Sequence, residues 1–193
     1  MTGPAPTRKP RADSQRNREK LLEVAAATFT ELGSDVSLEE IARRAGVGIG
    51  TLYRHFPNRD AIIADVYRRG VGQLAAAAAG LLESHPPLDA LRAWMELLVD
   101  YIAAKKVMAS ALNAMPGGTT ELYAASGPLI LNAITLLVDR AKAEGAVRPD
   151  AEASDLLLAL VGVAYSSPSP DWQAAALRVV DILIAGLKRT EAR

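Results

Sequence analysis

Apolar residues recur at steps of three and four along nearly the whole chain, which is the spacing of helices that bury one face. The first such stripe consists of Leu21, Leu22, Ala25, Phe29 and Leu32. Groups of Gly, Pro, Ser and Asn interrupt the pattern, and such groups mark the ends of helices. The 193 residues therefore predict an all-α protein of about nine helices with no convincing strand.

Composition excludes several kinds of chemistry. The chain has no cysteine, which excludes disulfides, thiolate zinc sites and a cysteine nucleophile. Its two histidines, His55 and His85, are too few for a histidine-built metal site without several carboxylates. No nucleophile elbow, phosphate-binding loop or His–carboxylate pair indicates an enzyme. We therefore expect no enzymatic activity, no metal and no cofactor.

Two segments bear on where the protein is located. The longest uncharged run, Leu122–Val138, contains Ser, Gly, Pro and Asn and is too short and too polar for a membrane span. Residues 1–13 hold three prolines but no apolar stretch of the kind found in secretory signals. Both observations predict a soluble, cytoplasmic protein without a membrane partner.

The formal net charge is zero, but the charges are unevenly distributed. Residues 1–70 carry 12 basic and 9 acidic side chains, whereas residues 71–193 carry 10 basic and 13 acidic ones. Arg8–Lys20 alone holds six basic and two acidic residues. This basic segment either contacts a polyanion or keeps the protein in solution, and charge alone supports both interpretations equally.

The most informative stretch is 37–56, whose pattern is a short helix, a glycine turn and a second short helix. Ser37-Leu38-Glu39-Glu40 is a capping box, in which Ser37 caps the Glu40 amide and Glu40 reaches back. Ala45-Gly46-Val47 supplies the turn. Helix-turn-helix units of this form place their second helix in the major groove of DNA.

The second short helix is expected over Gly48–His55, with Leu52 and Phe56 in the core. Its exposed positions are Gly48, Ile49, Gly50, Thr51, Tyr53, Arg54 and His55. Gly48 and Gly50 each cost a helix about 1 kcal/mol relative to alanine and bring no evident folding benefit. Their presence therefore favours a close approach of the backbone to DNA.

These motifs together resemble the N-terminal domain of the tetracycline-repressor (TetR/AcrR) family. The resemblance rests on Leu21–Phe29, Ser37–Ala42, Ala45–Val47 and Gly50–Phe56. It covers residues 14–70 closely, whereas residues 71–193 match in helix count and general pattern. Gly145–Asp150, which follows a long helix, also looks like part of a C-terminal domain common in actinobacterial members.

The resemblance implies a domain order and a mode of action. We expect a flexible basic arm at 1–13, a helix-turn-helix DNA-binding domain at 14–70 and a helical ligand-binding and dimerisation domain at 71–193. The resemblance further implies a homodimer that binds a palindromic operator in double-stranded DNA. An unknown small-molecule effector in the C-terminal domain would relieve repression.

Carried over by position, the resemblance also implies roles for single residues. Thr51 and Arg54 would face bases, Gly50 would lie close to the DNA, and Tyr53, His55 and Arg59 would contact phosphates. Ser37 could reach the DNA backbone, and Arg43 and Arg44 would add positive field near the turn. Ile49 stands where many members have a polar or basic residue, so a contact is lost or a thymine methyl is contacted instead.

Three of these assignments have structural alternatives. Tyr53 could instead belong to the core. His55 could be a C-terminal helix residue favoured by the helix dipole. Arg54 could be a solvated surface charge.

In the second half, candidate residues for two functions follow from helical position. The ligand-pocket candidates lie on central helices around the Pro116–Gly118 break: Trp94, Tyr101, Met108, Leu112, Met115, Tyr123, Ile130 and Ile134. The dimer candidates are small or apolar residues of the last two helices, Leu156–Tyr165 and Trp172–Leu187: Ala159, Val163, Ala175, Val179, Ile182 and Gly186. The alternative for both sets is packing within one subunit.

The sequence thus predicts a DNA-binding transcriptional regulator, most simply a homodimeric repressor released by a small molecule. A DNA-binding dimer without a small-molecule inducer fits the N-terminal motifs equally well. Only the second domain distinguishes the two functions.

Overall fold

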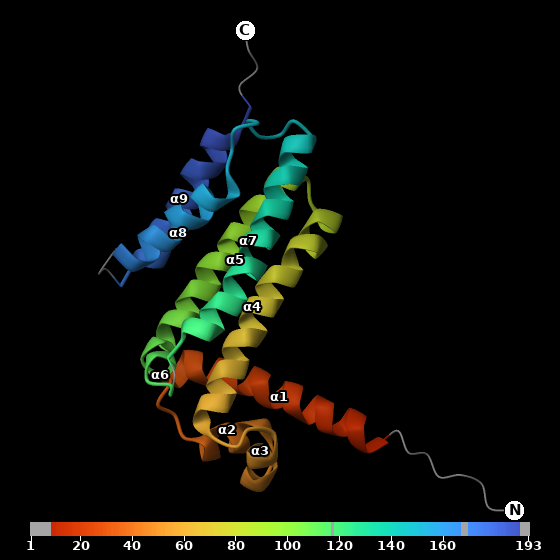
Figure 1. Cartoon of the computed structure of the whole chain (residues 1–193), viewed down its shortest axis with the longest axis vertical. Coiled ribbons are helices and arrows are strands. Elements are labelled where there is room, and N and C mark those ends of the chain that lie inside the picture. Colours follow the sequence, from red (N-terminus) through yellow and green to blue (C-terminus); the bar gives the residue numbers. More distant parts are fainter. Residues whose placement is uncertain (1–8, 117, 167–169, 190–193) are drawn as a thin grey trace, which may run out of the picture. The chain divides into compact units, whose positions relative to one another are not determined.

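The computed structural model describes residues 9–116, 118–166 and 170–189 (Figure 1). Within these residues it has nine α-helices and no strand, apart from one isolated bridge between Val147 and Lys188. The all-α prediction is therefore confirmed. Residues 1–8 of the predicted basic arm lie outside the described residues, and the first helix begins at Lys9.

The nine helices follow the breaks in the sequence. Their bounds are α1 Lys9–Leu32, α2 Leu38–Ala45, α3 Ile49–His55, α4 Arg59–Ser84, α5 Pro87–Val107, α6 Ala109–Asn113, α7 Thr120–Ala143, α8 Ala153–Ser166 and α9 Trp172–Leu187. They belong to two compact units, which we describe separately. Unit 1 comprises residues 1–67 and 107–118, and unit 2 comprises residues 68–106 and 119–193.

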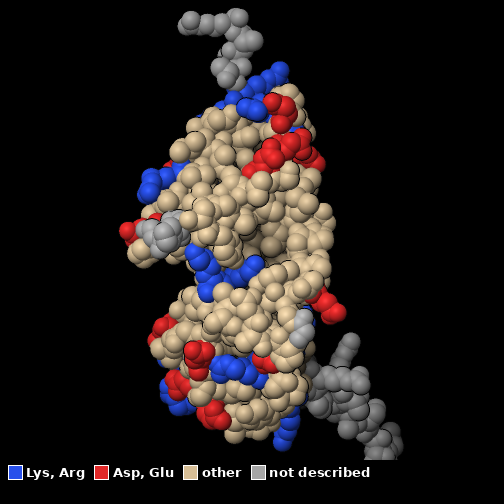
Figure 2. Space-filling model, turned by 60° about the vertical axis from the view of Figure 1, so that its left-hand side comes forward, with Lys and Arg blue, Asp and Glu red and all other residues tan. Residues whose placement is uncertain are grey.

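Unit 1 is organised around one apolar face of α1. Leu21, Ala25 and Phe29 on this face are fully buried, as their helical spacing predicts. The helix ends where Gly33 adopts a φ of 86° and donates its N–H to the Phe29 carbonyl at 2.9 Å. Acidic and basic side chains alternate over the surface of this unit in the lower part of Figure 2.

The beginning of α4 also lies in unit 1. Asn58 caps it, because its Oδ1 accepts the Ala61 N–H at 2.9 Å. Ile62 and Ile63 follow with their side chains fully buried. The start of α4 is therefore fixed at both its polar end and its apolar face.

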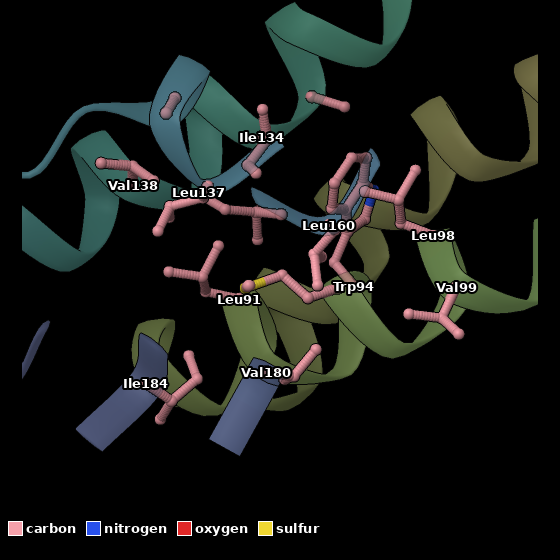
Figure 3. Packing of buried hydrophobic residues seen from close by; sticks show 14 of the residues in the cluster. Leu91, Trp94, Leu98, Val99, Ile134, Leu137, Val138, Leu160, Val180 and Ile184 are labelled. Carbon is pink, nitrogen blue, oxygen red and sulfur yellow. The ribbon is translucent and has the colours of Figure 1, made fainter. Parts of the chain in front are cut away.

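Unit 2 is held together by an apolar cluster between long helices (Figure 3). Trp94 of α5 lies among Leu91 and Leu98 of the same helix and leucines and valines of the facing helices. Its ring is fully buried, and its Nε1–H donates to the Leu74 carbonyl at 2.8 Å. The cluster also contains Ile134 and Leu137 of α7.

Two polar contacts hold the ends of helices in unit 2. The Arg148 N–H donates to the Leu187 carbonyl at 2.9 Å, which joins the α7–α8 connection to the end of α9. Lys106 Nζ donates to the Ala164 carbonyl at 2.8 Å and lies 4.4 Å from the centre of the Trp172 ring. The α8–α9 hairpin is thus tied to the end of α5.

Among the described helices, α7 alone is long and apolar enough to cross a membrane by length and composition. A core helix of a soluble protein meets the same criterion. On α7, Ile134, Leu137 and Val138 are buried in the core of unit 2, whereas Leu129, Leu131 and Leu136 are exposed.

Candidate nucleic-acid interface

The helix-turn-helix geometry is built by local interactions between α2 and α3. Ser37 Oγ accepts the Glu40 N–H at 3.2 Å, which confirms the predicted cap at the start of α2. At the end of α2, Gly46 adopts a φ of 67° and the Val47 N–H donates to the Ala42 carbonyl at 3.0 Å. A left-handed residue at this position favours glycine, because a Cβ would clash with the backbone.

The predicted second half of the capping box, in which Glu40 reaches back toward Ser37, is wrong. The Glu40 carboxylate does not complete the box but accepts hydrogen bonds from Arg43 Nε at 2.7 Å and Arg44 Nε at 2.8 Å. Arg44 also contacts Glu31 of α1, with Nη1 at 2.5 Å from Oε2. Charge-assisted bonds to guanidinium groups are stronger than a bond to a backbone amide, and this network fastens α2 to α1.

The network shifts the pKa values of its members. Hydrogen bonds from Arg43 and then Arg44 lower the pKa of Glu40 from 4.5 to about 2. A hydrogen bond from Arg44 likewise lowers the pKa of Glu31. The positive charges of Arg43 and Arg44 are therefore balanced within the unit, which reduces the field expected from them.

Helix α3 has one buried side and one open side. Leu52 and Phe56 are fully buried, as predicted, whereas Tyr53 is 45% exposed and Arg54 is also exposed. The alternative that Tyr53 belongs to the core is therefore wrong, because nearly half of the residue is exposed. Thr51 and His55 are half-buried at the edges of the open side.

Arg54 differs from the other arginines of the motif. Among the described residues it forms no ion pair, although Arg43 and Arg44 on α2 are both paired. An exposed, unpaired guanidinium on α3 can donate hydrogen bonds to an outside partner such as a phosphate or the edge of a guanine.

The two glycines of α3 have no packing role. A Cβ built on Gly48 or Gly50 meets no atom within 4 Å, and neither residue has a positive φ. Folding therefore does not require glycine at either position. Both are exposed beside Ile49, which is 36% exposed, so this end of α3 presents bare backbone to its surroundings.

Arg59, for which the resemblance implies a phosphate contact, makes a contact within unit 1. Its Nη1 donates to the Val36 carbonyl at 2.7 Å, and its Nη2 is buried without a hydrogen-bond partner. The guanidinium thus ties the start of α4 to the α1–α2 connection.

The eight predicted pocket residues are divided between the two units. Trp94 and Ile134 are fully buried members of the unit 2 core. Met108, Leu112 and Met115 fall in the 107–118 segment, which belongs to unit 1. Tyr101, Tyr123 and Ile130 are half-buried in unit 2.

A cavity of about 380 Å³ does lie in unit 2, between α4 and α7. It is lined by Arg68, Val71, Glu121, Leu122, Ala125, Ser126 and Leu129. None of these residues was selected from the sequence, because they come from helices whose adjacency is not encoded locally. The signal that could have indicated them is the presence of the charged residues Arg68 and Glu121 next to apolar residues of α4 and α7.

The outer face of α8 and α9 is apolar and open. Of the predicted dimer residues, Ala159, Val163, Ala175 and Val179 are half-buried, whereas Ile182 and Gly186 are exposed. Ile182 is 68% exposed, and the prediction missed Leu158 and Tyr165 on α8, which are 70% and 55% exposed. Figure 2 shows that the face over these two helices carries few charged side chains.

Comparisons with known proteins agree with this architecture. Residues 21–66 match the family model of bacterial regulatory proteins of the tetR family, and residues 86–189 match the C-terminal domain of SbtR-like transcriptional regulators. An HTH-type transcriptional regulator of Staphylococcus aureus (strain USA300) is 38% identical over 60 residues. That match covers 31% of this chain and 32% of the regulator, so the chain spans about a third of the length of this relative.

Two solved structures are similar over nearly the whole chain. A TetR transcriptional regulator from Streptomyces coelicolor is 46% identical with a TM-score of 0.80, covering 90% of this chain and 99% of that one. A TetR transcription regulatory protein from Mycobacterium vanbaalenii is 33% identical with a TM-score of 0.75, covering 93% and 99%. The fold and the motif define a helix-turn-helix transcriptional regulator. More particularly, the chain belongs to the TetR family.

Proposed function

We propose that this chain is a homodimeric transcriptional repressor that binds a palindromic DNA operator and is released by a small molecule. The observation that carries DNA binding is the open side of α3, where Arg54 is exposed and unpaired and Gly50 leaves the backbone uncovered. Unit 1 would bind DNA, and unit 2 would dimerise and bind the effector. The site of action would be the cytoplasm, where bacterial DNA lies.

The first experiment measures DNA binding directly. Fluorescence anisotropy would compare a duplex selected from a random library with a scrambled duplex at two salt concentrations. We expect salt-sensitive binding, a palindromic selected site and a preference of about 10³ or more. Weak binding without preference would refute the repressor function.

Arg54→Ala tests the residue that carries the proposal. Loss of a base contact should weaken operator binding by about 1–3 kcal/mol and leave binding to scrambled DNA nearly unchanged. Arg43→Ala is the matched control, because it removes the same charge from a side chain already paired with Glu40. Equal operator affinities for the two variants would contradict the role of Arg54.

The open face of α8 and α9 supports the dimer. A second copy of the same face would cover Leu158, Tyr165 and Ile182, and a two-fold axis would present two α3 helices to grooves about 34–36 Å apart. Ile182→Glu should therefore shift the mass in sedimentation toward one 20.4 kDa chain. Leu97→Glu is the control, since Leu97 is a 42% exposed residue on α5. A dimer that persists in Ile182→Glu would exclude this interface.

The cavity between α4 and α7 supports the effector. Its four apolar residues and its Arg68, Glu121 and Ser126 fit a mainly apolar molecule with one polar end. Such a molecule shifts the protein toward the released state only by its differential affinity for the two states.

The effector site can be blocked by filling it. Ala125→Trp places a ring in the cavity and should abolish release from DNA by a compound found in a thermal-shift screen, while DNA affinity stays unchanged. Ala124→Trp is the control, because Ala124 is exposed beside Ala125 but does not line the cavity. If no compound raises the melting temperature or releases DNA, the constitutive DNA-binding dimer is favoured instead.

A further inference from the structure

Arg18 of α1 contacts two other elements of unit 1. Its Nη2 forms an ion pair with Asp65 Oδ2 on α4. Its Cζ lies 5.2 Å from the centre of the Phe56 ring, within the range of a cation–π interaction. The Arg18 side chain therefore links α1 both to α4 and to Phe56, the residue that follows α3.

Phe56 is the residue at which α3 ends. It adopts extended φ and ψ angles of −134° and 99°, and its N–H donates to the Leu52 carbonyl at 2.8 Å. Its side chain is fully buried. Since the glycine turn at Gly46 fixes the entry to α3, a contact that fixes Phe56 determines where the helix leaves the motif.

The chemistry of arginine suits this position better than that of other cations. A planar guanidinium can face an aromatic ring and direct its N–H groups toward a carboxylate at the same time, which an ammonium group does less well. The two charged side chains are also partly screened from water, with 36% of Arg18 and 20% of Asp65 exposed. The ion pair is therefore weakened less by solvent than a fully exposed pair.

We propose that Arg18 is a positioning residue for DNA recognition, which holds the C-terminal end of α3 in the orientation that reads the operator. This inference rests on the proposed DNA-binding function. By charge alone Arg18 belongs with the basic N-terminal residues that attract a polyanion, but its contacts direct it into the unit. Its loss should therefore reduce sequence preference, not general attraction to DNA.

The test compares Arg18→Met with Arg16→Met. Arg16 lies on the same helix with 67% of its side chain exposed, and its ion pair is with Asp13 of the same helix. Both variants lose one positive charge, so general attraction to DNA changes equally. We measure affinities for the selected operator and for scrambled DNA well below the melting temperature. Arg18→Met should lower the ratio of the two affinities at least about tenfold, and Arg16→Met by less than about twofold.

Two further variants keep the test decisive if Arg18→Met folds poorly. Arg18→Lys keeps the charge and should recover part of the preference, and Asp65→Asn should lower the preference in the same direction as Arg18→Met. If all these variants keep the wild-type ratio, or if Arg18→Met and Arg16→Met weaken both DNAs by the same factor, the positioning role is overturned. If the wild-type protein binds the operator and scrambled DNA equally well, the proposed function itself is refuted, and this result is distinct from a change between variants.

Discussion

Unit 1 joins the short helices α2 and α3 to α1 through caps, a glycine turn and ion pairs in addition to buried apolar side chains, whereas unit 2 joins long helices through one apolar cluster around Trp94. In unit 1 Arg43 and Arg44 of the helix-turn-helix are paired with acidic side chains, whereas Arg54 projects from α3 without an ion pair among the described residues. In unit 2 many large apolar residues are packed in one cluster, whereas Leu158, Tyr165 and Ile182 of α8 and α9 are more than half exposed. In each unit we assign binding to exposed side chains, namely Arg54 on α3 and Leu158 and Ile182 on α8 and α9.

This difference implies different responses to mutation. Apolar packing contributes in proportion to the area removed from water, so core changes in unit 2 should have large effects. Exposed ion pairs and single caps contribute less to stability. Substitutions of these groups in unit 1 should therefore have smaller and more local effects. The predictions below run from the largest expected effect to the smallest.

The largest effect should come from Trp94→Ala. Removing a fully buried indole leaves a cavity and removes the hydrogen bond to the Leu74 carbonyl, and should lower the free energy of unfolding by about 3–5 kcal/mol. Urea unfolding followed by circular dichroism measures it. Trp94→Phe, which keeps an aromatic ring but loses the N–H donor, should cost clearly less. A loss below about 1 kcal/mol for Trp94→Ala would show that this cluster does not dominate unit 2.

Lys106→Met tests whether one polar contact matters within the apolar unit. It removes the bond to the Ala164 carbonyl and the contact with the Trp172 ring, and should cost about 1–3 kcal/mol. Lys188→Met is the control, because Lys188 is exposed and follows the opposite end of α9 from Trp172. Tryptophan fluorescence, to which both Trp94 and Trp172 contribute, follows the urea unfolding. Identical urea midpoints for the two variants would show that the contacts of Lys106 with the α8–α9 hairpin do not stabilise unit 2.

Two glycine substitutions in unit 1 should have opposite signs. Gly46→Ala forces an alanine into a left-handed conformation and should destabilise the protein by about 1–2 kcal/mol. Gly50→Ala improves helix propensity in open space and should stabilise it by up to about 1 kcal/mol. Thermal unfolding measures both. If Gly50→Ala also weakens operator binding, the glycine serves DNA approach; unchanged binding would show that it does not.

The smallest effect concerns pH. Because the pKa of Glu40 falls to about 2 in the folded state, its ionised form contributes stability above pH 4.5, which is lost as the pH falls toward 2. Between these values the melting temperature of Glu40→Gln should fall less steeply than that of the wild type. Glu39→Gln is the control on the same helix, because Glu39 forms no ion pair within the described residues. Parallel pH profiles for the wild type and Glu40→Gln would show that the Arg43 and Arg44 contacts do not stabilise the unit.

The helix-turn-helix was predictable because its determinants are local. The Ser37 cap, the Gly46 turn and the buried Leu52 lie within 20 residues, and each acts through the backbone or through a neighbouring turn of helix. The same holds for the Asn58 cap and for the helix breaks. The sequence alone therefore determined the all-α class, the motif and the family.

Contacts between distant residues were decided only by the tertiary structure. Arg18 meets Asp65 across 47 positions, and Arg59 is bound to the Val36 carbonyl across 23, so neither contact has a local signature. Trp94 and Leu122 both lie on apolar helix faces, yet one fills the core and the other lines a cavity. Helical spacing places a residue on the apolar face of its own helix. The packing of the other helices decides whether that face meets a neighbouring side chain, a cavity or solvent.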